Sequence, residues 1–378
     1  MSTKVAIVGI GLTSFRATSP GLSYKELMFE AATRAYEDAG LDARSDIGSF
    51  LTCSEDLAEG TSIFDEYVPD QIGGAERPVY TVGGDAIQGL ATAYMQIASG
   101  VVDVVSVEAH SKASNVVTPG ALHAMALDPV FVRPLGLNAH AMAGLEASMT
   151  GASREACAAV AAKNRRNALA NPSAAHGAAI DPRDVLASPP AFEPLTELEL
   201  AAPADGAVVI VLASEQRARK LRAEPVWLRG IGWATGSGLS SNGATADYAR
   251  TAAETAYRMA GVNNPAKEID FAEVDDSYSY KELQHLEALG LFGAGRAASA
   301  TTSGATARDG DLPVNVSGGR LGVGQLFEAN GAQAVAEVVA QLRGQAGPRQ
   351  LKRPKTGLAQ AWRGFPTATG AVAVMARD

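Results

Sequence analysis

The stretches AATRAYEDAG at 31–40 and AAETAYRMAG at 252–261 decide the fold, because they are two copies of one helical segment. They share six identities at one constant offset (257 − 36 = 221), and both end on a glycine typical of a helix C-terminus. The matched residues of the first copy are Ala31, Ala32, Ala35, Tyr36, Ala39 and Gly40. An apolar strand precedes each helix, VAIVGIG at 5–11 and VWLRGIGWA at 226–234, and a second strand follows it.

This repeated strand–helix–strand order indicates a duplicated chain. Two such halves with apolar strands predict two layered α/β domains that face each other across a cleft. We expect the N-terminal half to comprise residues 1–111 and 201–222, and the C-terminal half to comprise 223–378. The segment 112–200 between them, rich in Ala, Pro, Met and His, predicts a mostly helical lid or loop region.

The composition excludes several classes of protein. A net charge of −9 over 378 residues argues against general nucleic-acid binding, which needs a basic face. The N-terminus lacks a signal-peptide pattern, and no window is apolar for the roughly 18 residues of a membrane span. Cys53 and Cys157 form neither a disulfide framework nor a metal pattern, and no pair of histidines has metal-ligand spacing. We therefore expect a cytoplasmic protein without a bound metal.

The stretch YTVGGDAIQG at 80–89 predicts a strand that turns sharply into a helix. Such an elbow usually exposes a reactive side chain, yet the residues at this turn are Asp85 and Ala86, with no cysteine or serine. Asp85 can act as a base at the elbow or cap the helix that begins at Ala86, and the sequence leaves both roles open.

Four further stretches carry a family resemblance. They are VGGDAIQG (82–89), AEVDDSYSYKELQHLEALGLF (272–292), VNVSGGRLGVGQLFEANGAQAVAEVVAQLRG (314–344) and RGFPTATGAVAVM (363–375). Together and in this order they resemble the thiolase superfamily, with the nearest likeness to the branch of sterol-carrier-protein-type thiolases and steroid side-chain aldolases. The resemblance implies a duplicated thiolase fold of five α/β/α/β/α layers, which agrees with the internal repeat.

The residues that carry thiolase chemistry differ in this chain. The resemblance places the nucleophilic cysteine at Ala86 and the two motif histidines at Asp275 and Gln325. Trp362 and Arg363 stand where relatives carry a cysteine or a histidine–asparagine pair. Since alanine cannot form an acyl-enzyme, thiolysis through this elbow is excluded.

The remaining polar residues of these motifs suggest another chemistry. Asp275, Tyr278 or Tyr280 can serve as a general base or acid, and the amide of Gln325 can donate a hydrogen bond to a thioester oxygen. A strand through VDDSYSY would place Asp276, Tyr278 and Tyr280 on one face. Packing for Tyr278 and helix capping for Asp276 are the structural alternatives.

Coenzyme A contacts are expected at two places. Lys163, Arg165 and Arg166 form the best basic cluster of this acidic chain and can attract phosphates, although a solvated helix face is the alternative. Ser317 and Gly318 supply backbone N–H groups and a tight turn near the substrate. Coenzyme A would enter as part of the substrate, with no permanently bound cofactor.

Two functions remain open. One is an enzyme that makes or breaks carbon–carbon bonds of acyl-CoA by retro-aldol chemistry, without a cysteine acyl-enzyme. The other is a non-catalytic subunit of a heteromeric thiolase or acyltransferase, whose paralogous partner carries the cysteine. The resemblance implies a homodimer or a heterodimer with a thiolase paralogue, and a possible additional partner, a small OB-fold/zinc-ribbon protein.

Overall fold

The computed structural model describes residues 4–55, 60, 63–116, 119–222, 225–236 and 245–377. Nine strands form one continuous sheet in the order β3-β2-β4-β7-β1-β8-β11-β10-β9, and β5 and β6 form a separate pair. The strands are β1 Val5–Leu12, β2 Ser49–Cys53, β3 Val79–Val82, β4 Val104–Lys112, β5 Pro190–Phe192, β6 Leu195–Thr196, β7 Asp205–Ser214, β8 Val226–Thr235, β9 Phe271–Glu273, β10 Thr356–Trp362 and β11 Thr369–Ala376.

The helices fill the connections between these strands. They are α1 Tyr24–Ala39, α2 Ala43–Asp46, α4 Pro69–Ile72, α5 Ala86–Ala98, α6 Pro119–Met125, α7 Ala139–Thr150, α8 Arg154–Ala168, α9 Pro182–Ala187, α10 Glu215–Leu221, α11 Asp247–Ala260, α12 Pro265–Glu268, α13 Ser279–Ala288, α14 Ala297–Thr302, α15 Gly319–Val323 and α16 Asn330–Arg343. Within the described residues, no helix combines the length and apolar composition needed to cross a lipid bilayer.

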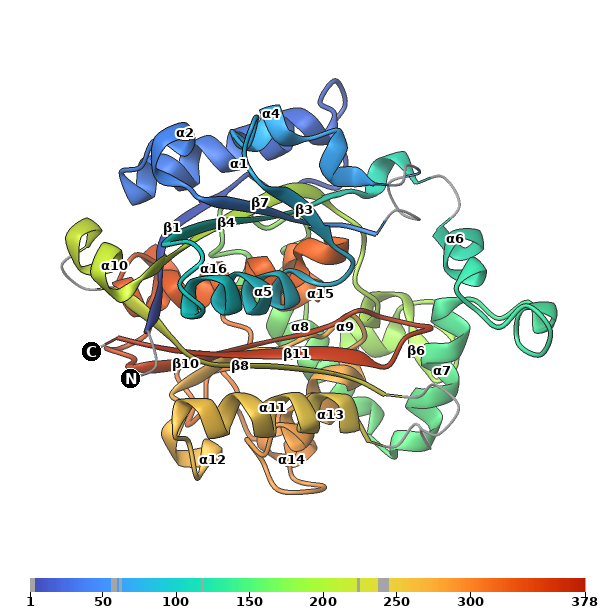
Figure 1. The fold of residues 1–378 in the computed structure, drawn as a ribbon. Helices are drawn as coiled ribbons and strands as arrows, with labels where there is room; N and C mark the ends of the chain where they lie inside the picture. Colours follow the sequence, from blue (N-terminus) through green and yellow to red (C-terminus); the bar gives the residue numbers. More distant parts are fainter. Residues whose placement is uncertain are drawn as a thin grey trace.

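The predicted five-layer architecture is confirmed (Figure 1). Helices α1, α2 and α4 cover one half of the sheet, and α11 to α14 cover the other half. The central layer contains α5 and α16, whose apolar residues pack between the two half-sheets. The two half-sheets meet where β1 pairs with β8, at Ala6–Trp227 and Ile7–Val226.

The strand order has the symmetry that a duplication requires. Outward from the junction, β1-β7-β4-β2 in one half corresponds to β8-β11-β10-β9 in the other. A parallel bridge between Ala272 and Val314 adds the counterpart of β3 beside β9. The topology therefore agrees with a pseudo-two-fold relation between the halves.

The repeated alanines have a packing reason. A Cβ on Gly11 of β1 would lie 2.0 Å from the carbonyl oxygen of Ala31 in α1, and a Cβ on Gly232 of β8 would lie 2.3 Å from that of Ala252 in α11. The two contacts are related by the same offset (232 − 11 = 252 − 31 = 221). Each outer helix thus approaches its strand so closely that only glycine fits on the strand.

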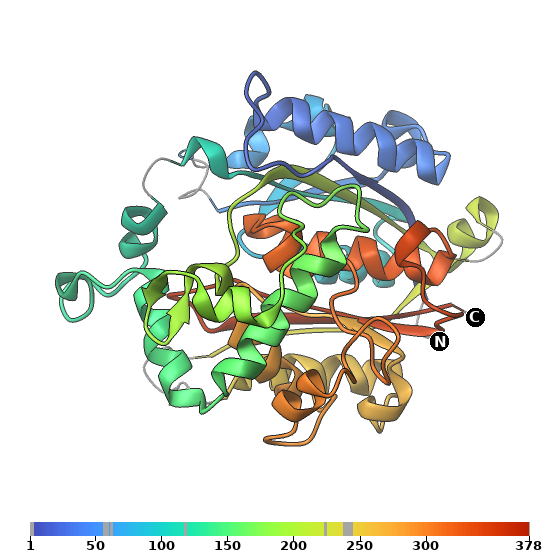
Figure 2. The ribbon, with the colours of Figure 1, turned by 180° about the vertical axis from the view of Figure 1, so that it is seen from behind.

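The region between the halves contains α6 to α9 and the β5–β6 hairpin. Helix α6 and the chain after it project from the body of the molecule, whereas α7 and α8 pack near the C-terminal half (Figures 1 and 2). Helix α8 begins after Ser153, whose side chain accepts a hydrogen bond from the backbone N–H of Ala156. The three-part domain boundaries given above stay a prediction.

Candidate active site

The elbow aspartate lies between the two central helices. Asp85 caps α5, since its Oδ1 accepts a hydrogen bond of 2.8 Å from the Ile87 N–H. Its Oδ2 accepts one of 2.8 Å from Gly331 N–H, in the first turn of α16. Burial raises the pKa of Asp85 to about 6. Both carboxylate oxygens thus bind helix N-termini from opposite halves, which supports the capping role.

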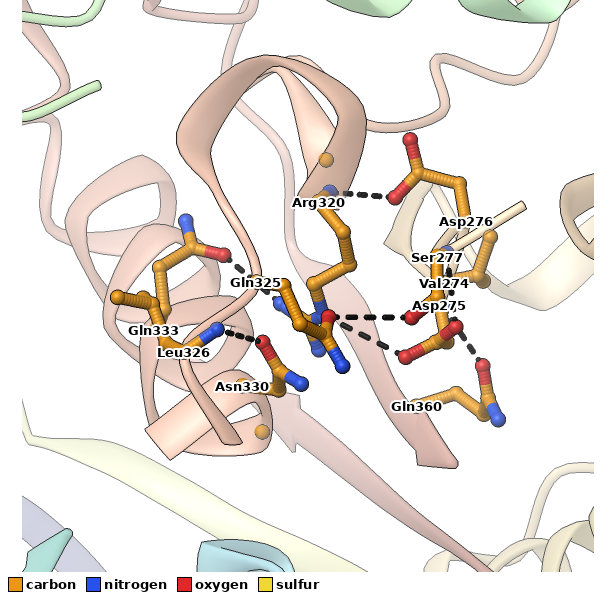
Figure 3. A network of polar contacts seen from close by, with 12 residues as sticks. Val274, Asp275, Asp276, Ser277, Arg320, Gln325, Leu326, Asn330, Gln333 and Gln360 are labelled. Carbon is orange, nitrogen blue, oxygen red and sulfur yellow. Dashed lines mark hydrogen bonds and ion pairs between the residues drawn. The ribbon is translucent and has the colours of Figure 1, made fainter. Parts of the chain in front are cut away.

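Asp275, at the position of a catalytic histidine, forms a buried ion pair with Arg320 (Figure 3). The Arg320 Nε lies 3.5 Å from Asp275 Oδ2, and its Nη1 donates to Gln333 Oε1 at 3.1 Å. Asp275 Oδ1 accepts from the Ser277 N–H, and the Asp275 N–H donates to Gln360 Oε1. Because Asp275 has no exposed surface, its carboxylate is poorly placed to take a proton from a substrate.

The Asp276 carboxylate is bound by groups of α8 and α15. It accepts hydrogen bonds from the Asn164 side chain and from the backbone N–H groups of Arg320 and Leu321, so it caps α15. Burial and the nearby Glu282 raise its pKa to about 7. The expected alternation on one strand face is wrong here, because β9 ends at Glu273 and α13 begins at Ser279. The intervening turn sends successive side chains in several directions.

Tyr278 is the phenol that reaches an accessible partner. Its hydroxyl lies 3.0 Å from Nδ1 of His140 on α7, and His140 itself is solvent-exposed. The Tyr278 ring contacts Trp362, the last residue of β10, and Phe365 of the β10–β11 connection. Burial raises the pKa of Tyr278, whereas burial and the neighbouring His123 lower that of His140. At neutral pH the pair is therefore a neutral phenol beside a neutral imidazole.

Tyr280 belongs to a different, closed network. Its hydroxyl donates to Glu146 Oε2 at 2.6 Å, and the ammonium of Lys281 lies 2.6 Å from the same oxygen. Tyr280 is 1% exposed, and its pKa is raised first by burial and then by Glu146. This cluster fastens α7 to α13, and it gives Tyr280 a structural partner in place of a substrate.

Gln325 is held by its neighbour. The hydroxyl of Ser277 donates to Gln325 Oε1 at 3.2 Å (Figure 3), and the Gln325 backbone pairs with the chain at Ala202 and Ala204. No described residue accepts a hydrogen bond from the Gln325 side-chain nitrogen. The amide is thus oriented with its donor available, as an oxyanion site requires.

Neither cysteine supplies the missing nucleophile. Cys53 ends β2 and lies against the elbow helix α5, where a Cβ on Gly89 would be 2.3 Å from its Sγ. Burial and the surrounding carboxylates raise its pKa well above the usual range, so the thiol stays protonated. Burial likewise raises the pKa of Cys157 to about 12.

The basic cluster of α8 is largely occupied within the protein. Lys163 Nζ lies 2.7 Å from the buried carboxylate of Glu282. The Arg165 guanidinium donates to the carbonyl oxygens of Leu198 and Leu200. Arg166 is exposed and donates to a backbone carbonyl at 2.7 Å. Contact of these three residues with coenzyme A stays a prediction, and of the three only Arg166 is open to solvent.

The turn at Ser317 and Gly318 is also closed. The Ser317 N–H donates to Glu273 Oε1 at 3.1 Å, and the Gly318 N–H donates to the Asn315 carbonyl at 3.0 Å. A Cβ on Gly318 would lie 2.5 Å from that of Ala168, so glycine is needed for packing against α8. The predicted substrate contact of this turn therefore has no free N–H donor to support it.

The structure thus gives Tyr278 an exposed partner in His140 and bonds Gln325 to Ser277, the residue before Tyr278, whereas it places Asp85, Asp275 and Tyr280 in internal networks. Sequence reasoning undervalued His140, a histidine in the lid without any motif. It also missed Arg320, although a single arginine within the apolar run 314–326 is a usable signal of a buried ion pair.

Two further features complete the site. Arg363, which follows the end of β10 at Trp362, forms an ion pair with Glu55. Burial lowers the pKa of Arg363. Across the described ranges, no group of three or more His, Cys, Asp or Glu side chains is placed to hold a metal ion.

Comparison with known proteins agrees with this architecture. Residues 236–377 match the family model "Thiolase C-terminal domain-like". The chain is 31% identical to 17-hydroxy-3-oxo-4-pregnene-20-carboxyl-CoA lyase of Mycobacterium tuberculosis, over 91% of this chain and 92% of that protein. It is 29% identical to acetyl-CoA acetyltransferase of Methanothermobacter thermautotrophicus, over 94% of each. A solved structure, Ltp2-ChsH2(DUF35) aldolase, superposes with a TM-score of 0.86 at 27% identity, covering 99% of this chain and 98% of that one.

Proposed function

The chain belongs to the thiolase superfamily, in the branch of sterol carrier protein 2 thiolases and steroid side-chain aldolases, and from this premise we propose that it cleaves or forms a carbon–carbon bond of an acyl-CoA by a retro-aldol reaction. The observation that carries the proposal is the hydrogen bond of 3.0 Å between the Tyr278 hydroxyl and His140 Nδ1. A second supporting observation is the Gln325 amide, whose oxygen accepts a hydrogen bond from Ser277, the residue before Tyr278.

In the cleavage direction the substrate is a β-hydroxyacyl-CoA. The β-hydroxyl gives its proton to the Tyr278 oxygen while the phenolic proton passes to His140, so that neither group bears a full charge before the transfer. The electron pair of the Cα–Cβ bond moves toward the thioester as the β-carbon becomes a carbonyl. A ketone or aldehyde leaves, and the proton returned to Cα completes the shorter acyl-CoA.

The enolate oxygen formed in this step needs a hydrogen-bond donor. The Gln325 amide supplies it, because Ser277 fixes the amide oxygen and so directs the –NH2 group elsewhere. A neutral donor in a partly desolvated cleft stabilises developing negative charge more than water does. This step requires no thiolate, in keeping with Ala86 at the elbow and with the protonated, buried Cys53.

The second candidate is a subunit that carries no catalysis of its own. This candidate is favoured by the internal hydrogen bonds and ion pairs of Asp85, Asp275 and Tyr280, because these bonds occupy the side chains that a substrate would otherwise contact. In that case a paralogous partner would carry the cysteine. In either case we propose an assembly with a second thiolase-like chain, identical or paralogous, and with a small OB-fold/zinc-ribbon protein that contacts coenzyme A.

The two candidates are separated by a cleavage assay in D2O. The protein, alone and with partners that co-purify from its host, is incubated with β-hydroxyacyl-CoA thioesters, and the products are analysed by mass spectrometry. Retro-aldol cleavage gives a carbonyl product and an acyl-CoA with one deuterium at Cα, without added free coenzyme A. Activity that needs free coenzyme A and disappears after iodoacetamide treatment of a partner would instead support the non-catalytic subunit.

A further inference from the structure

A hollow lies on α8, and neither Tyr278 nor Gln325 is among its lining residues. Its volume is about 440 Å³, within the range of small-molecule sites. Helix α8 faces the viewer in Figure 2, with the orange segment around α14 below it. The lining residues come from α8 and the turn after it, the start of α9, the segment 301–309 and Val316; they are Ala159, Ala162, Lys163, Arg166, Asn167, Ala170, Pro182, Thr301, Gly304, Ala307, Arg308, Asp309 and Val316.

One face of α8 forms the wall of this hollow. Ala159, Lys163, Arg166 and Ala170 follow each other at spacings of four, three and four residues, which places them on one side of a helix. The small alanine side chains leave room for the hollow, and the two basic side chains carry positive charge at its wall. The opposite face of α8 points inward, where Asn164 donates to Asp276 and Glu282.

The hollow is basic although the chain is acidic. Its lining contains two guanidinium groups, of Arg166 and Arg308, against one carboxylate, of Asp309, and the ammonium of Lys163 is already paired with the buried Glu282. The whole chain has a net charge of −9. An excess of positive charge gathered in one concave place raises the local concentration of anions.

The two guanidinium groups are anchored and still have donors to offer. Arg166 Nη2 donates to the Ile180 carbonyl at 2.7 Å, and Arg308 Nη1 donates to the Pro348 carbonyl at 2.9 Å. Each bond occupies one of the five N–H groups of a guanidinium, so that the other groups can meet an acceptor. Anchoring lowers the entropy lost when an anion binds.

We infer that this α8 hollow binds a small phosphorylated anion, through the guanidinium groups of Arg166 and Arg308. Guanidinium pairs with phosphate through two parallel charge-assisted hydrogen bonds, which a carboxylate or phosphate oxygen accepts. Among the described residues no aromatic side chain lines the hollow, so a nucleobase would pack against the alanines, Pro182 and Val316. The phosphate or pyrophosphate group, shared by inorganic anions and nucleotides, is therefore the part that is recognised.

The choice of variants follows from the contacts. Lys163 is unsuitable because its ammonium neutralises Glu282, whose carboxylate also accepts hydrogen bonds from Asn164 and Asn315. Removing Lys163 would disturb that buried network. Arg166→Gln and Arg308→Gln change exposed side chains. Arg183→Gln on α9 is the matched control, since that side chain is 91% exposed and does not line the hollow.

The test is isothermal titration calorimetry of the full chain with pyrophosphate and with ADP, in the absence of acyl-CoA and at two salt concentrations. Binding to the wild-type protein should weaken at the higher salt concentration. At a fixed salt concentration, Arg166→Gln and Arg308→Gln should each weaken binding about tenfold relative to the wild type, whereas Arg183→Gln should leave it unchanged. Equal affinity for the two probes would identify an inorganic anion as the ligand, and tighter ADP binding a nucleotide; both support the inference.

Two results would overturn it. One is no binding of either probe at millimolar concentration. The other is binding that both arginine variants leave unchanged, which would place the anion elsewhere on the protein. Because no substrate turnover is measured, failure here leaves the retro-aldol proposal untouched, and failure of that proposal leaves this one untouched.

Discussion

Replacing Tyr278 by phenylalanine removes one oxygen from the candidate site and little else. The ring is 6% exposed and keeps its contacts with Tyr280, Trp362 and Phe365. The only loss is the hydrogen bond to His140, which is exposed and can bond to water instead. We expect the free energy of unfolding to fall by about 1 kcal/mol or less.

The effect on catalysis should be much larger. A positioned acid or base contributes roughly 10²–10⁴-fold to a rate, which corresponds to about 3–5 kcal/mol of activation free energy. Since the hydroxyl acts in the bond-breaking step, kcat should fall while KM changes little. His140→Gln should also lower kcat, and the decline of activity at acid pH should move, because the imidazole no longer titrates.

The assay is steady-state cleavage of a β-hydroxyacyl-CoA by the reconstituted complex, with thermal unfolding as the folding control. Tyr257→Phe is the matched variant, because its hydroxyl also makes one hydrogen bond, of 2.8 Å to the Leu289 carbonyl, on α11 outside the cleft. It should keep wild-type kcat. A folded Tyr278→Phe protein with a kcat within threefold of wild type would falsify the proposed proton transfer.

Three further outcomes follow from the buried charges. Asp275→Asn leaves Arg320 without its carboxylate, so the free energy of unfolding in urea should fall by about 3–5 kcal/mol; an unchanged value would mean that the pair contributes nothing. Iodoacetamide should label Cys53 only after denaturation, and labelling of the native protein, seen by mass spectrometry, contradicts the buried thiol. Burial and a neighbouring carboxylate raise the pKa of Asp276 to about 7 and of Glu273 to about 8. In the folded state these two carboxyl groups therefore keep protons that the unfolded chain releases near pH 4. The free energy of unfolding should then fall as the pH rises from 5.5 to 8.5, by at most about 1.4 kcal/mol per pH unit for each carboxyl group. A melting temperature that rises over this range contradicts the assignment.

The duplicated fold was predictable because its signal is local and repeated. The alanine pattern around Tyr36 and Tyr257 reports a helix packed closely on a strand, and the partner glycines lie on the strand next to it in sequence. The elbow at Asp85 was predictable for the same reason, since its turn and its cap involve adjacent residues.

The contacts that define the site were not predictable from spacing. Asp85 meets Gly331 across 246 residues, and Tyr278 meets His140 across 138. The alternation expected through VDDSYSY was wrong because the strand ends early, which a pattern of polar residues does not reveal. A polar residue type indicates that a group needs a partner, but the fold decides which partner it finds.

The hydrogen-bond and ion-pair partners of the candidate site residues limit the reactions in which these residues can take part. A buried carboxylate or ammonium costs free energy unless other groups satisfy it, and such a group is then held in one charge state and one geometry. Asp85, Asp275 and Tyr280 are satisfied in this way, so a substrate would have to break an internal bond to use them. Tyr278 and Gln325 differ, because the first bonds to an exposed imidazole and the second has its donor unengaged among the described residues. The reaction that we propose therefore uses a neutral phenol and a neutral amide, which suit proton transfer and enolate stabilisation better than acyl transfer.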